Sequence, residues 1–216
     1  MNYFWETLRA DWPLILQKTS EHMYLSLISV LIACVLAIPL GIFLTRQKKV
    51  ANGIITIISV IQTIPSLALF GFLIPFFGIG TTPAIIALTL YSLLPILQNT
   101  YVGILDVNGA LIEAGTGMGM TKGQILRMIQ LPIARGVILA GIRLVVVQTI
   151  SLATIATYIA AGGLGDIITR GISMVNTVTI LEGAIPVSIL VIVVNLLLLG
   201  ANYFLTPKGL RGQTKI

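Results

Sequence analysis

The amino-acid sequence predicts an all-α polytopic membrane protein with about five transmembrane helices. Of its 216 residues, 56% are hydrophobic and only 9% are charged, whereas a soluble domain carries roughly 25% charged residues. The mean hydropathy is +1.03. Five apolar runs are long enough to cross a bilayer, which takes about 20 residues of helix. Little length remains for a soluble domain, so we expect a single transmembrane domain over residues 1–216.

The expected spans follow from these runs and from the residues that interrupt them. They cover residues 22–44, 51–77, 83–105, 136–161 and 183–205. The second span should kink or break near Pro65, because proline lacks a backbone N–H and the freed carbonyl needs a partner in lipid. Thr82 and Pro83 predict the start of the third span, as cap and first helical residue. His22, at the start of the first span, is expected to be an interfacial polar residue.

The segments outside the spans fall into three groups. Residues 1–21 mix aromatic side chains such as Trp5 and Trp12 with charges, which is typical of a segment lying along an interface. Residues 162–182 form a glycine-bounded segment that is too polar to span. Residues 106–135 form the longest interval without a membrane-length apolar run, and they combine charges, glycines and two short apolar-periodic segments.

The 106–135 loop is expected to hold two short helices. The first passes through Ala110 and Leu111 and breaks at the following glycines. Thr121 can cap the second, whose Ile125, Met128 and Ile129 would form one face, and Pro132 is expected to end it. Such a loop is either a docking surface for another subunit or a polar loop whose helices lie on lipid headgroups. Its composition favours docking.

These loop residues resemble the EAA signature of ABC importer permeases, E-A-A-x3-G-x9-I-x-L-P. The match consists of Glu113 and Ala114, then Gly119, Ile129, and Leu131 with Pro132; Gly115 departs from it by replacing the usual third-position alanine. The resemblance implies cytoplasmic coupling helices that sit in a groove of an ATPase subunit. The coupling residues expected on this basis are Glu113, Ala114, Gly115, Gly117, Gly119, Thr121, Ile129, Leu131 and Pro132.

The distribution of basic residues predicts the orientation. A cytoplasmic loop places on the inside Arg46, Lys48, Lys49, Lys122, Arg127, Arg135, Lys208, Arg211 and Lys215. The outside then holds Arg9, Lys18 and Arg170, and Arg143 is expected near the cytoplasmic end of its helix. This is the excess expected of cytoplasmic loops. Five spans put the N-terminus outside and the C-terminus in the cytoplasm.

Several function classes are disfavoured by what the sequence lacks. Ion-coupled carriers usually need an intramembrane carboxylate or histidine, but the seven acids are expected in loops or, for Glu182, at a helix start. Backbone carbonyls could still bind sodium, so an ion-coupled secondary transporter stays open. No Gly-Lys pair occurs, so a phosphate-binding loop of the Walker type is absent. With one His and one Cys, neither a metal cluster nor a catalytic nucleophile and base pair is expected.

A polar-lined helical bundle with a docking loop therefore predicts a transport subunit driven by another chain, not an enzyme. Polar side chains within the spans are candidates for the translocation path, with helix-to-helix hydrogen bonding as their alternative use. The candidates are Gln62, Ser66, Tyr91, Gln98, Asn99, Gln148 and Thr154.

Beyond residue 20, the chain resembles the permeases of osmoprotectant ABC importers. The segments that carry this likeness are IPLGIFLTRQKK (38–49), IQTIPSLALFGFLIPFFGIG (61–80), YSLLPILQNTYVGI (91–104), AGGLGD (161–166) and TPKGL (206–210). The resemblance implies the type I importer permease (MetI-like) fold in a bacterial cytoplasmic membrane. It also implies a quaternary ammonium substrate: glycine betaine, carnitine or choline. A permease for another small solute, such as an amino acid, is the alternative.

The same resemblance implies the partners. These are a second permease chain, identical or paralogous, two cytoplasmic ATPase subunits and an external substrate-binding protein. ATP and Mg²⁺ would be held by the ATPases, so no cofactor is expected in this chain and no metal or nucleic-acid site.

Overall fold

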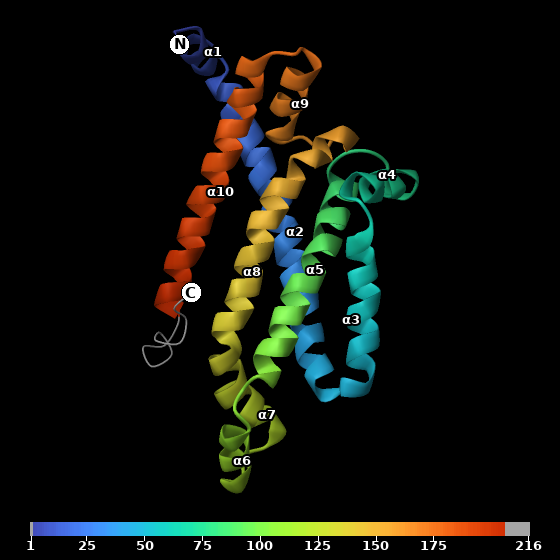
Figure 1. Cartoon of the computed structure of the whole chain (residues 1–216), viewed down its shortest axis with the longest axis vertical. Coiled ribbons are helices and arrows are strands. Elements are labelled where there is room, and N and C mark those ends of the chain that lie inside the picture. The colour runs from blue at the N-terminus through green and yellow to red at the C-terminus, as the bar shows by residue number, and fades with distance from the viewer. Residues whose placement is uncertain (1, 206–216) are drawn as a thin grey trace.

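The computed structural model describes residues 2–205, and its side chains from 5 to 202. All regular elements of this part are helices. Five long helices run along the long axis of the molecule: α2 (Trp12–Arg46), α3 (Lys48–Thr63), α5 (Thr81–Leu105), α8 (Leu131–Ala153) and α10 (Thr177–Leu205) (Figure 1). Within the described residues, four helices are long and apolar enough to cross a membrane, or five if α3 and the bent helix after it count as one span. The all-helical membrane fold is confirmed.

The core lies where α2, α5 and α8 meet, and small residues let these helices approach closely. A Cβ atom on Gly41 of α2 would lie 2.9 Å from the Thr100 Cβ of α5. One on Gly141 of α8 would lie 2.6 Å from the Asn99 Cβ of α5. Buried hydroxyls add a direct link, since the Ser92 hydroxyl is 3.0 Å from that of Thr149. The three helices therefore form a tightly packed unit to which α3 and α10 are added.

The second span is broken at the predicted place. Helix α3 ends at Thr63, Pro65 is extended, and α4 (Ser66–Phe77) leaves at 97° to α3, across the end of the bundle (Figure 1). The Ile64 carbonyl at the break accepts a hydrogen bond from the Tyr91 hydroxyl of α5. Gln62 Nε2 donates to the Tyr91 carbonyl at 2.6 Å. The carbonyl exposed by the break thus finds its partner on a neighbouring helix, as the absence of water in lipid requires.

Other helix bounds differ from the expected spans. Helix α2 begins at Trp12, so part of the expected interfacial segment continues into the first span. Helix α5 begins at Thr81 after Gly80, so the predicted cap at Thr82 is wrong, and Pro83 lies in the first turn, where its missing N–H costs nothing. Helix α8 ends at Ala153 and is followed by the 3₁₀ helix η2 (Ile155–Ile159).

His22 is fully buried, not interfacial, because α2 extends beyond it. Its Nε2 atom lies 2.8 Å from the Ile150 carbonyl of α8. Gly163, in the loop after η2, packs so closely that a Cβ there would lie 3.0 Å from His22 Nδ1. The residue is therefore part of the contact between α2, α8 and this loop.

The bundle has two distinct ends. One carries α6 (Gly109–Gly117), α7 (Lys122–Ile125) and the turn between α2 and α3; the other carries α1 (Asn2–Ala10), α4 and α9 (Gly165–Ser173) (Figure 1). The α6–α7 end includes the positions of Arg46, Lys48, Lys49, Lys122, Arg127 and Arg135, and the α4–α9 end those of Arg9, Lys18 and Arg170. Lys208, Arg211 and Lys215 lie outside the described residues. Apart from Arg143, the described basic residues are thus divided between the ends as the sequence predicts.

Candidate functional site

The loop between α5 and α8 is built by side-chain caps. The Asn108 side chain accepts a hydrogen bond from the Ala110 N–H at 2.9 Å and starts α6. Thr121 and Gln124 form a capping box at the start of α7: Thr121 Oγ1 accepts from the Gln124 N–H, and Gln124 Oε1 accepts from the Thr121 N–H at 2.7 Å. Each bond satisfies a backbone donor that a helix start leaves free. The predicted cap at Thr121 is confirmed.

Gly115 and Gly119 fold the two short helices against each other. Gly115 is the buried residue of α6, and a Cβ there would lie 2.9 Å from Ile129 Cδ1 and 3.5 Å from Ile125 Cγ1. Gly119 has φ +81°, a left-handed conformation that side chains rarely adopt, and its N–H donates to the Thr116 carbonyl at 2.9 Å. The Met120 N–H then donates to the Gly115 carbonyl at 3.0 Å. The chain therefore reverses direction between the helices in a fixed, hydrogen-bonded turn.

The second short helix does not end at Pro132, which corrects that prediction. Helix α7 continues through a π-helical turn, η1 (Leu126–Gln130), into α8, with Pro132 in the first turn of α8. The π turn is wider than an α turn, which relieves the clash of the proline ring with the carbonyl four residues earlier. It also changes the helix phase: Ile125 is buried and Ile129 half-buried, but Met128 is 67% exposed. Met128 therefore does not share their face.

Leu131 connects the loop to the bundle. It packs with Leu126 against a cluster formed by Ile104 of α5 and by Ala134 and Ile138 of α8. Helices α7, η1 and α8 are continuous, so one unbroken helix joins the loop to the bundle.

The exposed side chains of the loop include three apolar ones, one acid and the basic Lys122 and Arg127. Met118 is 75% exposed, Met128 is 67% exposed and Leu111 is also exposed. Glu113, Ala114 and Gly117 lie on the exposed part of α6, and no described residue forms an ion pair with Glu113. Large apolar side chains exposed on a polar loop are a feature of interaction surfaces.

The candidate path residues fall into separate places. Gln62 and Tyr91 meet at the break of the second span, and Ser66 starts α4 beside them. Gln98 and Asn99 line a groove of about 370 Å³ with Ile55 of α3. Gln148 is exposed on α8, and the Thr154 hydroxyl donates to the Ser151 carbonyl just before α8 ends. The described residues thus bring two pairs together but form no single polar site.

Two charged residues lie elsewhere than expected. Arg143 is near the middle of α8, not close to its end, because α8 begins at Leu131 and extends through the bundle. Glu182 does not mark a helix start: α10 begins at Thr177, and α9 folds back so closely that a Cβ on Gly183 would lie 3.0 Å from the Ile168 backbone nitrogen. The Glu182 side chain is 1% exposed as a result.

Comparison with known proteins assigns the family. Residues 37–209 match the model of the binding-protein-dependent transport system inner membrane component. The chain belongs to this family. It is 51% identical over 197 residues to the carnitine transport permease protein OpuCB of Listeria monocytogenes, covering 91% of this chain and 90% of that protein. It is 44% identical to the glycine betaine/carnitine/choline transport system permease protein OpuCB of Bacillus subtilis, covering all of both chains.

Solved structures agree on the fold. An inward-facing structure of the MetNI methionine ABC transporter superposes with a TM-score of 0.83 at 22% identity, covering 92% of this chain and 99% of that one. The type I (MetI-like) fold is therefore confirmed. The protein is a permease subunit of an ABC importer, not an enzyme; ATP hydrolysis belongs to a partner ATPase, and a substrate-binding protein is part of the system.

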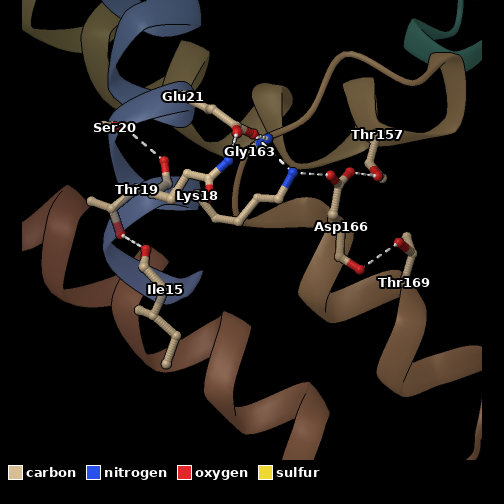
Figure 2. A network of polar contacts seen from close by, with 10 residues as sticks. Ile15, Lys18, Thr19, Ser20, Glu21, Thr157, Gly163, Asp166 and Thr169 are labelled. Carbon is tan, nitrogen blue, oxygen red and sulfur yellow. Dashed lines mark hydrogen bonds and ion pairs between the residues drawn. The ribbon is translucent and has the colours of Figure 1, made fainter. Parts of the chain in front are cut away.

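A polar network at the α4–α9 end of the permease was not predicted. Lys18 Nζ of α2 lies 2.9 Å from Glu21 Oε2 and 2.7 Å from Asp166 Oδ2 of α9 (Figure 2). The Gly163 N–H donates to Glu21 at 3.0 Å, and the Thr157 hydroxyl donates to Asp166. The sequence offers only the spacing of Lys18 and Glu21 as a signal, because Asp166 is far away along the chain. The network fixes α2 to α9 and to the loop before it.

We expect Lys18→Met to destabilise this end of the permease. Lys18 is the only cation in the network drawn in Figure 2. Its loss leaves the carboxylates of Glu21 and Asp166 without the positive charge that both of them contact. Removing one partner of a partly buried ion pair lowers the free energy of unfolding by about 1–3 kcal/mol. Thermal unfolding in detergent should show a lower midpoint for Lys18→Met and a midpoint close to wild type for Lys18→Arg. Equal midpoints for all three proteins would contradict the assigned role.

We also expect Gly115 to tolerate alanine and reject leucine. A single Cβ meets mainly the flexible end of Ile129, which can shift, whereas leucine would separate α6 from Ile125 and Ile129. Uptake by the assembled transporter should stay within about twofold for Gly115→Ala and fall about tenfold or more for Gly115→Leu. Gly109→Ala, with open space around the glycine, is the matched control. Full uptake with leucine would show that the packing of the two helices is unimportant.

Proposed function

We propose that this permease forms the translocation path for a quaternary ammonium osmolyte: glycine betaine, carnitine or choline. Support comes from relatives that share 44–51% identity over most of their length and whose names give these solutes. The solved transporters of methionine and other amino acids share only the fold, at 20–22% identity. An amino acid is therefore the weaker candidate substrate.

The 106–135 loop is proposed to be the ATPase docking element. Met118, Met128, Leu111 and Glu113 are exposed on it, and its continuity with α8 provides a mechanical link. The loop lies at the end with the more numerous described basic residues, which favours the cytoplasm for this end and the outside for the N-terminus. The membrane is then the bacterial cytoplasmic membrane, with the C-terminus inside.

The assembly is proposed to contain two permease chains, two ATPases and one external binding protein. Apolar residues are exposed on α10, among them Leu196 and Leu197, and Gln148 is exposed on α8. These exposed surfaces can contact lipid and a second permease. Gln62, Ser66, Tyr91, Gln98, Asn99, Gln148 and Thr154 remain the proposed path residues. ATP and Mg²⁺ would be bound by the ATPases.

The proposed mechanism has two states. ATP binding brings the ATPases together and moves the docked loops with them. Leu131 and the continuous α7–α8 helix pass this movement to α8, and the packing of α8 on α5 and α2 carries it to the rest of the bundle. The path would then switch from inward-open to outward-open. Substrate affinity is expected to lie mainly in the binding protein, where aromatic side chains can recognise a quaternary amine.

Uptake by the complete transporter tests the substrate. Proteoliposomes with both permease chains, the ATPases and the binding protein should accumulate labelled glycine betaine, carnitine or choline when supplied with ATP. Methionine serves as the comparison solute. Accumulation of methionine and none of the three ammonium compounds would overturn the proposed substrate class.

Cross-linking tests the docking element. A photoreactive residue in place of the exposed Met118 should cross-link to the ATPase, whereas one in place of Phe72 on α4 at the opposite end should not. Cross-links from Phe72 to the ATPase, or none from Met118, would refute the proposed placement.

A further inference from the structure

Arg143 is a half-buried arginine on α8, and it has no counter-ion among the described residues. Arg143 is near the middle of α8, and its Nε atom donates to Asn195 Oδ1 of α10 at 2.8 Å. None of the ion pairs among the described residues involves Arg143. Asn195 is neutral, so the arginine charge is not balanced by it. Charged side chains within spans are costly and usually mark substrate or ion pathways.

The guanidinium keeps donors for a further ligand. It has five N–H donors, and the bond to Asn195 uses only one of them. The two terminal nitrogens make no hydrogen bond within residues 5–202. A guanidinium presents paired donors in the geometry that a carboxylate accepts with both oxygens. The Nε bond links the arginine to α10 and leaves both terminal nitrogens for a ligand.

A groove of about 460 Å³ opens at this arginine between α8 and α10. Apart from Arg143 and Asn195, its walls are apolar, with Leu144 and Val147 from α8 and Val191 and Ile192 from α10. A molecule that fits both the guanidinium and the apolar walls of this groove has an anionic group and an apolar or methylated body. Leu144 also lies one helical turn from the exposed Gln148, so the groove adjoins the surface proposed for the path.

We propose that Arg143 binds the carboxylate of zwitterionic solutes during their passage through the permease. This inference rests on the proposed function, and it divides the substrate class in two. Glycine betaine and carnitine have a carboxylate for Arg143, whereas choline has a hydroxyl and only a positive charge, which the guanidinium repels. Arg143 thus favours carboxylated ammonium compounds over choline inside the membrane, after the binding protein has made its own selection.

The test compares three solutes in proteoliposomes of the complete transporter. Arg143→Gln should lower the uptake of glycine betaine and carnitine about tenfold or more, the range expected for a lost charge-assisted pair. Choline uptake should be unchanged or higher. Arg143→Lys keeps the charge and should retain most of the uptake of the carboxylated solutes. Gly200→Ala, on α10 with open space around it, should behave as wild type.

Asn195→Ala separates solute binding from a structural role. It breaks the same hydrogen bond between α8 and α10 but leaves the arginine charge. It should therefore lower the uptake of glycine betaine, carnitine and choline by the same small factor. If Arg143→Gln and Asn195→Ala reduce the three solutes equally, Arg143 only holds α10 in place and the proposal is overturned. Unchanged uptake of glycine betaine and carnitine by Arg143→Gln would overturn it as well.

The headgroup of a net-anionic lipid is the other anion that could reach the groove. Vesicles of phosphatidylcholine with and without phosphatidylglycerol distinguish it: a lipid ligand predicts that wild-type uptake of all three solutes depends on phosphatidylglycerol and that Arg143→Gln removes this dependence. If the wild-type transporter carries none of the ammonium compounds, the proposed function fails on its own. In that case the uptake of the carboxylated solute that the transporter does carry, such as an amino acid, is measured for Arg143→Gln and for Asn195→Ala. The comparison of these two variants then decides the role of Arg143.

Discussion

Replacement of Gly119 by Trp is expected to reduce uptake to background while the permease remains in the membrane. Gly119 has φ +81° at the turn between α6 and α7, which an L side chain adopts at a cost of roughly 1–2 kcal/mol. Nothing in the described structure lies within 4 Å of a Cβ at this position, so the indole would project from the loop into the surface proposed for the ATPase. Both effects act on the loop and leave the bundle intact.

The controls distinguish these two effects. Gly119→Ala imposes the backbone cost without the bulk and should lose only part of the uptake. Gly123→Ala, within α7, also has open space but no left-handed backbone, so it should be neutral or slightly stabilising. Membrane fractionation reports the amount of permease and a labelled-solute assay its activity. Wild-type uptake by Gly119→Trp would argue against docking through this loop.

The largest loss of stability is expected from Gly165→Ala. A Cβ on Gly165 would lie 2.2 Å from the Thr154 carbonyl oxygen and 2.9 Å from its carbon, both backbone atoms that cannot rotate away. The first turn of α9 would have to move off the end of α8, and Asp166 would move with it, out of the network around Lys18. Overpacking of this kind costs about 1–3 kcal/mol and sometimes more.

Thermal unfolding in detergent measures this cost. Gly165→Ala should lower the midpoint more than Lys18→Met, because it displaces the whole loop and not one side chain. Gly53→Ala is the matched control, since Gly53 lies inside α3 with nothing near its Cβ position. A midpoint for Gly165→Ala equal to that of the control would show that α9 can shift without loss.

Features set by local chemistry could be predicted from the sequence. The break at Pro65 follows from a missing N–H, and the start of α7 follows from the hydroxyl of Thr121 three residues before Gln124. The long apolar runs similarly predict the five long helices. Membership of the importer permease family was carried by the fixed spacing from Glu113 to Pro132, and the family model and the relatives confirm it.

Features set by tertiary contacts could not be predicted from the sequence. Pro132 was expected to end a helix, but the π turn before it lets the helix continue into α8. His22 was expected to be interfacial and Glu182 to lie at a helix start. Nothing local reveals that the loop before α9 covers His22 and that α9 covers the start of α10. Lys18 pairs with Asp166 and Arg143 with Asn195 across large separations in sequence. Composition and periodicity carry no information on such partners.

The most direct test of the account is accumulation of solute by the permease with and without its ATPase. We expect proteoliposomes of the complete transporter to concentrate a quaternary ammonium compound only when ATP is present, and permease chains alone to concentrate none under a proton or sodium gradient. Gradient-driven accumulation by the permease chains alone would contradict the claim that the ATPase drives transport through the 106–135 loop.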